Sequence, residues 1–254
     1  MITVDPQTLN LQPGQKVLDL GCGEGRHAIH FAITDNVDVV GVDLNPADIC
    51  TAQERAQPFV EQEQLSGRLL LSVADGQRLP FADQTFDVVI CSEVLEHIED
   101  YAGVLAEIDR VLKPSGIFAA SVPAFFPEWI CWKLSDEYHQ VEGGHIRIFR
   151  ERQLRRSIEQ LGHRYFSRHK AHALHAPYWW LKCFLWHRPE SRILSGYHRL
   201  LVWDMMRKPW LTRWLEKLLN PLLGKSIVLY FVKPPRANVV ESVEAGSPAV
   251  EVSV

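Results

Sequence analysis

A glycine-rich turn at residues 17–25, with the sequence VLDLGCGEG, carries the strongest chemical signal in this chain. Glycines between a strand and a helix let the backbone approach a ligand closely, and they leave helix N-terminal amides pointing at it. The spacing that begins with Gly21 and Gly23 is G-x-G-x-G, whereas a dinucleotide pyrophosphate loop has G-x-G-x-x-G. Asp19 lies two residues before Gly21, and its carboxylate would repel a pyrophosphate but attract an ammonium or sulfonium group. The turn therefore predicts a site for a positively charged nucleoside.

Polar residues also follow three later segments that have the apolar pattern of buried strands. Asp43 ends the segment VDVVGVD, and Ser92 follows FDVVIC. Asp75 and Gly76 follow LLLSVA. In an open α/β sheet, ligands bind beyond the carboxyl ends of the strands, near the point where the strand order reverses. We therefore expect these residues to lie close to the glycine-rich turn.

The elements that must position these residues alternate between strand and helix patterns from residue 16 to about residue 161. Strands are expected at 17–20, 37–43, 69–73, 86–91 and 117–122. Helices are expected at 26–33, 46–55, 101–112 and 151–161. Strands separated by helices imply parallel βαβ units, so we predict an α/β fold with a doubly wound, Rossmann-like sheet.

The composition of the 254 residues is that of an ordinary globular protein, with 46% hydrophobic and 23% charged residues. The net charge of −4 gives no reason to expect a nucleic acid as partner. Five cysteines without a C-x-x-C pair argue against a disulfide framework and a zinc site, and we expect no metal. We see neither a signal peptide nor an apolar stretch of the ~18 residues that a membrane span needs. A cytoplasmic protein is therefore expected.

Four motifs occur in order over residues 15–122: VLDLGCGEG, GVDLN, VADGQRLPFADQTFDVVICSEVLEHIED and EIDRVLKPSG. With them the chain resembles the class I S-adenosylmethionine (SAM)-dependent methyltransferases, in the small-molecule branch typified by the ubiquinone/menaquinone-biosynthesis methyltransferases. The resemblance continues more weakly through residues 151–161. It implies SAM as the cofactor and a seven-stranded sheet whose last strand is antiparallel, a role that residues 226–232 fit.

The resemblance also implies which residues bind the methionine and ribose parts of SAM. Carried over by position, Asp19, Gly21 and Gly23 shape the site of the methionine end. Asp43 would accept hydrogen bonds from both ribose hydroxyls, which an ionised carboxylate does well. Taken alone, Asp43 could instead cap the next helix.

For the adenine part of SAM, the resemblance implies residues after three of the strands. Leu44 would pack on the face of the ring, and Asp75 would accept a hydrogen bond from the amino group. The backbone at Gly76 would read the ring edge, and Ser92 completes the expected cofactor site. Taken alone, Asp75-Gly76 could be an ordinary turn.

If the methyl acceptor carries a hydroxyl or an acidic C–H group, a general base must remove a proton. The candidates are His97 after the fourth strand, and Tyr138, His139 and His145 in SDEYHQVEGGHIRIF. Histidine titrates near neutrality, so each of the three could serve. The alternative is that they are structural, with Glu96 and His97 forming a pair on a helix surface.

All eight tryptophans lie in two stretches, residues 123–145 and 172–225. The second stretch holds nine Lys/Arg against three acidic residues. If 163–169 is the family's sixth strand, this insert leaves the sheet beside the active site. We expect a core at 1–171, a helical cap insert at 172–225, the last strand at 226–233 and a disordered tail at 234–254.

Two roles for the insert remain open. It could supply an apolar acceptor pocket, or its aromatic and basic residues could seat the protein on an anionic membrane surface, at the inner face of the membrane. Alternatively, the aromatic residues pack a small core or a dimer interface, and the oligomeric state is not predicted.

The predicted function is SAM-dependent O- or C-methylation of a small, apolar or lipid-like acceptor by in-line displacement. An NAD(P)-dependent oxidoreductase is the first alternative, and the glycine spacing, Asp19 and Asp75-Gly76 count against it. A non-catalytic SAM-binding or scaffold protein is the second. A nucleic-acid methyltransferase is disfavoured, because CSEVLEH stands where a base-binding N/D-P-P-Y/W motif would lie.

Overall fold

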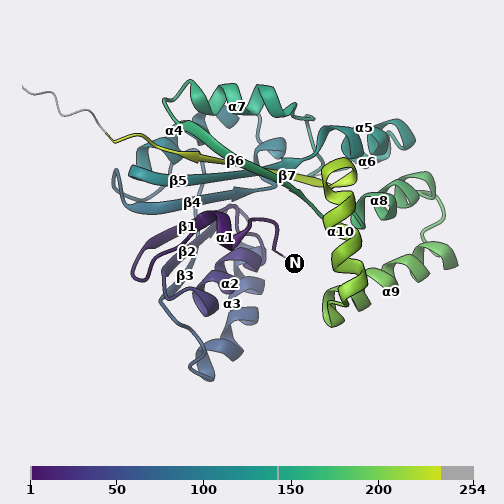
Figure 1. Ribbon diagram of the computed structural model, residues 1–254, viewed down its shortest axis with the longest axis horizontal. Coiled ribbons are helices and arrows are strands. Elements are labelled where there is room, and N and C mark those ends of the chain that lie inside the picture. Colours follow the sequence, from purple (N-terminus) through teal and green to yellow (C-terminus); the bar gives the residue numbers. More distant parts are fainter. Residues whose placement is uncertain (1, 142, 236–254) are drawn as a thin grey trace, which may run out of the picture.

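The computed structural model describes residues 2–141 and 143–235, which form a seven-stranded sheet flanked by helices (Figure 1). The strand order is β3-β2-β1-β4-β5-β7-β6. The strands are β1 (Lys16–Leu20), β2 (Asp38–Asp43), β3 (Leu69–Val73), β4 (Phe86–Ser92), β5 (Leu112–Pro123), β6 (Arg164–Ala171) and β7 (Ser226–Val232). Each expected strand is therefore confirmed, with ends that differ by a few residues.

The last strand, β7, lies between β5 and β6 and runs antiparallel to both, whereas the other neighbouring pairs are parallel. Val228 at its centre is opposite Ser121 of β5 on one side and His169 of β6 on the other. This topology confirms the predicted α/β class with an antiparallel last strand. The strand order reverses between β1 and β4, so ligand binding is expected at their carboxyl ends.

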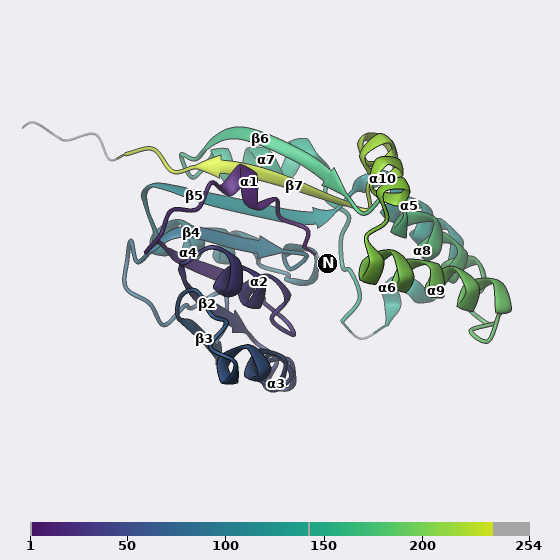
Figure 2. The same ribbon diagram turned by 60° about the horizontal axis from the view of Figure 1, so that its bottom comes forward.

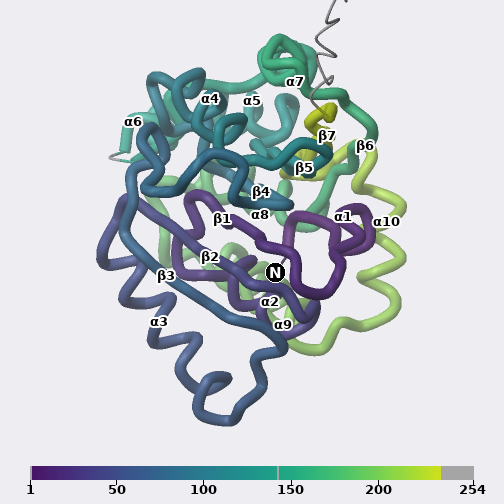
Figure 3. Tube along the Cα trace, turned by 90° about the vertical axis from the view of Figure 1, so that its left-hand side faces the viewer, coloured from purple at the N-terminus to yellow at the C-terminus, as the bar shows by residue number. Residues whose placement is uncertain are grey.

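Helices cover both faces of the sheet (Figures 1 and 3). The helices on one face are α1 (Pro6–Leu9), α2 (Arg26–Thr34) and α3 (Pro46–Glu61). Those on the other face are α4 (Tyr101–Val111) and α7 (Glu151–Glu159). Phe31 of α2 packs in one buried cluster with Val17, and Ile108 of α4 packs in a second cluster with Leu18. Successive residues of β1 thus point to opposite faces, as the period of a strand requires.

Helix α3 is longer than the helix expected at 46–55. Asn45 caps its first turn by accepting a hydrogen bond from the Ala47 amide at 3.0 Å. The helix continues past residue 55 because Ala56 keeps the buried spacing begun by Ile49. Pro58 lies inside the helix, where it lacks an amide and so removes one intrahelical hydrogen bond without ending the element.

A group of helices, which we call the cap, lies beyond the carboxyl ends of the parallel strands (Figures 1 and 2). It consists of α5 (Phe125–Leu134), α6 (Glu137–Gln140), α8 (His175–Phe184), α9 (Arg192–Arg207) and α10 (Trp210–Leu223). The insert is therefore helical, as expected. The sequence pattern did not predict α5, because apolar residues occur around the whole helix and leave no polar stripe to reveal its period.

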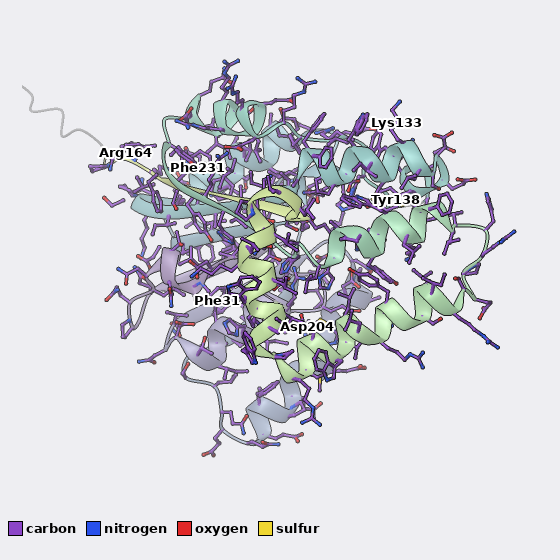
Figure 4. The ribbon with its side chains drawn as sticks, turned by 45° about the vertical axis from the view of Figure 1, so that its right-hand side comes forward. Phe31, Lys133, Tyr138, Arg164, Asp204 and Phe231 are labelled. Carbon is purple, nitrogen blue, oxygen red and sulfur yellow. The ribbon has the colours of Figure 1, made fainter. Side chains whose placement is uncertain are left out.

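The cap contains a small core of its own. Cys131, Tyr138 and Cys183 are buried there, and four tryptophans pack against them: Trp132, Trp179, Trp180 and Trp186. Figure 4 shows Tyr138 in this cap and Phe231 within the sheet. The two tryptophan-bearing stretches thus share one packed cluster. For these four side chains, the structure agrees with the alternative in which the aromatic residues pack a small core.

Residues near the N-terminus connect the sheet, α2 and the start of the insert. The Thr3 amide donates a hydrogen bond to His27 Nε2 at 3.1 Å, and Thr3 Oγ1 lies 3.1 Å from His172 Nε2. The Asp5 amide donates to the Tyr230 hydroxyl at 2.8 Å. Burial lowers the pKa of His27 to about 3, so its ring is neutral and can accept from the amide.

Among the described helices, none combines the length and the apolar character needed to cross a membrane. The predicted disordered tail at 234–254 lies, from residue 236 on, outside the described residues. The predicted domain boundaries stay predictions.

Candidate functional site

A cleft of about 810 Å³ lies at the carboxyl ends of β1, β2, β3 and β4. It is lined by five of the residues predicted for the cofactor: Gly21, Asp43, Leu44, Asp75 and Gly76. The strand ends therefore bring together residues that are up to 55 positions apart in the sequence.

The two glycines of the turn have different surroundings. Gly21 has φ +69°, and a Cβ atom there would lie 2.3 Å from Cγ2 of Val94, so no larger residue fits. Gly23 has φ +51°, and a Cβ atom there would meet no described atom within 4 Å. Its amide donates a hydrogen bond to Asp43 Oδ2 at 2.8 Å. Gly21 thus allows the turn to pack, and Gly23 links the turn to the end of β2.

The Asp43 carboxylate is held by two backbone amides. Oδ2 accepts from Gly23, and Oδ1 accepts from the Asn45 amide at 2.9 Å. Each carboxylate oxygen keeps a further lone pair, so the group can accept two more hydrogen bonds from a ligand. Next to it, Leu44 is 69% exposed, so its apolar side chain is available for contact with a ligand.

Asp75 lies across the cleft in a turn. Its Oδ1 atom accepts a hydrogen bond from the Gln77 amide at 2.9 Å, which is the pattern of an Asx turn. The turn interpretation and the binding interpretation are therefore compatible, because the turn presents Asp75 and Gly76 to the cleft.

Three predicted cofactor residues, Asp19, Gly23 and Ser92, are not among the residues that line this cleft as described. Asp19 is buried, and its Oδ2 atom accepts a hydrogen bond from the Ala28 amide at 3.0 Å. Burial raises the pKa of this carboxyl to about 7. Asp19 thus fixes β1 to the beginning of α2, and Ser92 is buried at the end of β4.

The candidate bases lie at one end of the cleft. His97 lines the cleft, and the centre of its ring is 4.9 Å from that of His145. His145 Nδ1 lies 2.6 Å from Glu128 Oε1, and the Tyr138 hydroxyl donates to Glu128 Oε2 at 3.2 Å. The structure therefore brings His145 and Tyr138 to one buried carboxylate and places His97 next to His145.

His139 and Tyr138 are poorly placed to act as bases. The His139 ring stacks on Trp132, with 4.2 Å between the ring centres and an angle of 12° between the planes. Burial and the neighbouring Glu128 carboxylate raise the pKa of the Tyr138 phenol well above its usual range. A phenol that stays protonated donates a hydrogen bond but does not take up a proton, which leaves His97 and His145 as the better placed candidates.

Three acidic residues at this end of the cleft were missed by the sequence analysis. Glu93 lines the cleft, and its Oε1 atom accepts a hydrogen bond from the Ser121 hydroxyl at 2.7 Å. One alternative placed Glu96 in a surface pair with His97, but Glu96 is 0% exposed, because the single 3₁₀ turn η1 (Leu95–His97) directs it inward. Glu128 comes from α5, which the sequence pattern did not predict. The one available signal was the position of EVLEH directly after β4.

Comparison with known proteins gives matches centred on the same strands. Residues 18–120 match a family model described as a methyltransferase domain. A segment of 140 residues is 36% identical to a sterol 24-C-methyltransferase of Aspergillus fumigatus, and covers 55% of this chain and 34% of that protein. A segment of 111 residues is 35% identical to the 27-O-demethylrifamycin SV methyltransferase of Amycolatopsis mediterranei, and covers 44% of this chain and 39% of that protein. The matches thus span less than two fifths of these two relatives.

A solved structure extends the similarity to nearly the whole fold. A SAM-dependent methyltransferase from Methanosarcina mazei superposes with a TM-score of 0.61 over 92% of this chain and 100% of that chain. The identity is 17%, so this comparison supports the fold. The ordered motifs and the family model thus match residues 18–120 to the methyltransferase domain of SAM-dependent enzymes, and the superposition shows that the fold around them is of the same kind.

Proposed function

We propose that this chain transfers a methyl group from SAM to an oxygen or carbon atom of a small, apolar or lipid-like acceptor. The observation that carries the proposal is the cleft in which Gly21, Asp43, Leu44, Asp75 and Gly76 meet at the strand ends. SAM supplies a methyl group on a positively charged sulfur, which is already activated for displacement. The task left to the protein is to align the acceptor, exclude water and, where needed, accept a proton.

The residues of the cleft fit the cofactor. The Asp43 carboxylate is fixed by two amides and has lone pairs for the two ribose hydroxyls. Exposed Leu44 offers an apolar surface for the adenine ring, and Asp75 offers a carboxylate for its amino group. The open space at Gly23 lets the turn approach the methionine end of the cofactor.

Calorimetric titration with SAM, its demethylated product and NAD tests the cofactor. We expect binding of the first two and none of NAD, and the reverse result would support an oxidoreductase. Transfer of a radiolabelled methyl group from SAM into a lipid and metabolite extract of the source cell then tests activity. Binding without any transfer would favour the non-catalytic alternative, and mass analysis of a labelled product would identify the acceptor.

The acceptor class is supported by features of the cap. The relatives named above act on a sterol and on a demethylrifamycin, as their names state. In the cap, α9 and α10 expose eleven large apolar side chains: Ile193, Leu200, Val202, Trp203, Met205, Met206, Trp210, Leu211, Trp214, Leu218 and Leu222. Arg207, Arg213 and Lys217 lie exposed on the same two helices, and Lys208 is exposed at the residue that follows α9.

These two helices are also the basis for a proposed membrane contact. Amphipathic helices with aromatic and basic residues bind at the interface of anionic membranes without crossing them. In this proposal, the protein seats α9 and α10 on the inner face of the cell membrane and collects a lipid-like acceptor there. The exposed tryptophans are separate from the four that pack the core of the cap. Partitioning of the protein onto anionic vesicles tests this contact.

A further inference from the structure

Glu96 is a buried carboxylate beside the cleft whose charge the proposed binding of SAM does not use. It is 0% exposed, and neither carboxylate oxygen has a hydrogen-bond partner among residues 2–141 and 143–235. Burying a carboxylate without partners is strongly unfavourable, so such a group is expected to be protonated or to bind a cation. The pKa of Glu96 is raised, first by burial and then by the Glu93 carboxylate. The backbone amide of Glu96 and the Lys225 ammonium act in the opposite direction, but neither forms a hydrogen bond of normal geometry with the carboxylate.

Two histidines complete a set of ligand atoms around this carboxylate. One nitrogen of His97, one nitrogen of His145 and one oxygen of Glu96 all lie within 4.8 Å of one another. His97 is exposed and lines the cleft, whereas Glu96 closes the set from the interior. The arrangement is therefore open on the side that faces the cleft.

One ring nitrogen of each histidine, Nδ1, already has an oxygen partner. His97 Nδ1 lies 3.2 Å from the Gly144 carbonyl oxygen, which can only accept, so Nδ1 carries the proton. His145 Nδ1 lies 2.6 Å from Glu128 Oε1. Both interactions leave Nε2 with a free lone pair. Histidines that bind metals are typically oriented in this way, by a carbonyl or a carboxylate at the other ring nitrogen.

Glu128 is itself rigidly held, which strengthens this interpretation. It is 2% exposed, and it accepts hydrogen bonds from Trp132 Nε1 at 3.0 Å and from the Tyr138 hydroxyl at 3.2 Å. The predicted candidate Tyr138 thus positions Glu128, and Glu128 positions His145. The hydrogen bonds from Tyr138 to Glu128 and from Glu128 to His145 thus connect the cap to the cleft.

We propose that Glu96, His97 and His145 bind one divalent first-row transition-metal ion, such as Mn²⁺, Co²⁺ or Zn²⁺, through a carboxylate oxygen and two imidazole nitrogens. Two imidazoles and a carboxylate suit these ions better than Ca²⁺ or Mg²⁺, which prefer oxygen ligands. Three protein ligands leave coordination positions for water or for the acceptor. This site departs from the expectation of no metal, which rested on the absence of cysteine pairs.

The site also narrows the acceptor class, a step that rests on the proposed methyl transfer. Because His97 belongs to both the ion site and the cleft, the ion would lie next to the methyl donor. A metal ion lowers the pKa of a coordinated hydroxyl, whose proton passes to solvent. The acceptor oxygen then forms a bond to the methyl carbon as the carbon–sulfur bond breaks, and the sulfur keeps the electron pair. Acceptors with two neighbouring hydroxyls, which can occupy two open positions, fit best.

The binding of the metal can be measured on the full chain without SAM or an acceptor. Titration with Mn²⁺, followed by electron paramagnetic resonance, and with Co²⁺, followed by visible absorption, should show one ion per chain. Glu96→Gln and His145→Gln should each weaken binding more than tenfold. Glu128→Gln, which removes a positioning residue, should weaken it by about tenfold. The matched control is His187→Gln, since the His187 side chain is 82% exposed in the cap, and it should bind as the wild type does.

Two results would overturn the site: no stoichiometric ion in the wild type, or variants of Glu96 and His145 that bind as tightly as the wild type. His97→Gln is the ligand variant in which misfolding is not expected, because the His97 side chain is exposed and its removal leaves the interior unchanged. Titration of the same preparations with SAM separates the proposals. A protein that binds SAM but no metal ion would refute the metal site alone. A protein that binds the ion but not SAM would refute the proposed function alone.

Discussion

The turns that end the parallel strands and the outer helices of the cap present their side chains in opposite ways. At the strand ends, polar groups such as Asp43 and Asp75 are fixed by backbone amides before any ligand arrives. On α9 and α10, large apolar side chains are exposed, and Trp210 is 79% exposed. A preorganised polar site favours the binding of one small ligand, whereas an apolar helix face favours binding to an extended surface. In the proposed function, donor binding and acceptor delivery are therefore separate tasks of separate regions.

The strongest test of this separation is Asp43→Ala, which should affect the strand ends alone. It removes two charge-assisted hydrogen bonds to a ligand, each of about 1.5–3 kcal/mol, so the affinity for SAM should fall roughly 100-fold or more. Calorimetry measures the loss, and vesicle binding should stay unchanged. Asp38→Ala is the matched control, because Asp38 lies at the other end of β2 in a surface pair with Arg68. An Asp43 variant that retains its affinity would contradict the assignment.

The same substitution at two glycines should have opposite effects in the two regions. Gly21→Ala introduces a left-handed alanine and a clash with Val94, so we expect a cost of roughly 2 kcal/mol and weaker SAM binding. Gly196 lies inside α9, and a methyl group added there would meet no described atom within 4 Å, so Gly196→Ala should stabilise the helix by about 0.5–1 kcal/mol. Urea unfolding and SAM titration of both variants provide the measurement. Equal changes in the free energy of unfolding and in the affinity for SAM of the two variants would contradict the difference between the two regions.

A smaller effect is expected when one exposed tryptophan of the cap is removed. Trp210→Ser should lower partitioning onto anionic vesicles about tenfold, since a large apolar side chain contributes about 1.5–3 kcal/mol when it leaves water. The affinity for SAM should not change. Leu70→Ser is the control, because Leu70 is 56% exposed on the edge strand β3, away from the cap. Unchanged partitioning of the Trp210 variant would argue against the membrane contact.

The smallest expected effect concerns His27, which is linked through Thr3 to His172 at the start of the insert. Burial lowers its pKa to about 3 in the folded state, whereas an unfolded histidine has a pKa of about 6.5. The unfolded chain therefore binds more protons between these values, and folding stability falls as the pH drops below about 6.5.

His27→Gln should remove that contribution. Between pH 6.5 and pH 5.5, the wild type should lose about 1 kcal/mol more than the variant in urea unfolding. Buried Asp19, whose pKa is raised, favours folding on acidification, and it is present in both proteins. The contribution of Asp19 cancels when the pH dependence of the free energy of unfolding is compared between the two proteins. The same pH dependence in both would refute the role of His27.

The strand ends were largely predictable from the sequence, because short apolar runs followed by glycines or acids have few alternative structures. The orientation of Asp19 was predictable in principle. It alternates with Leu18 and Leu20 along β1, so it must face α2 when they face the opposite cluster. The inward orientation of Glu96 was not predictable, since a single 3₁₀ turn has no periodicity. The same holds for Glu128, which reaches His145 across the fold from a helix with no polar stripe.

The position of β7 also constrains the order in which the molecule can assemble. Residues 226–232 lie between two strands that are complete by residue 171, and they hydrogen-bond to both. Until the segment after the cap has been synthesised, β5 and β6 each present an unpaired edge. The cap must therefore emerge from the ribosome before the sheet can close. A chain shortened to residue 225 would be expected to aggregate through those edges, even though every residue that lines the cleft is present.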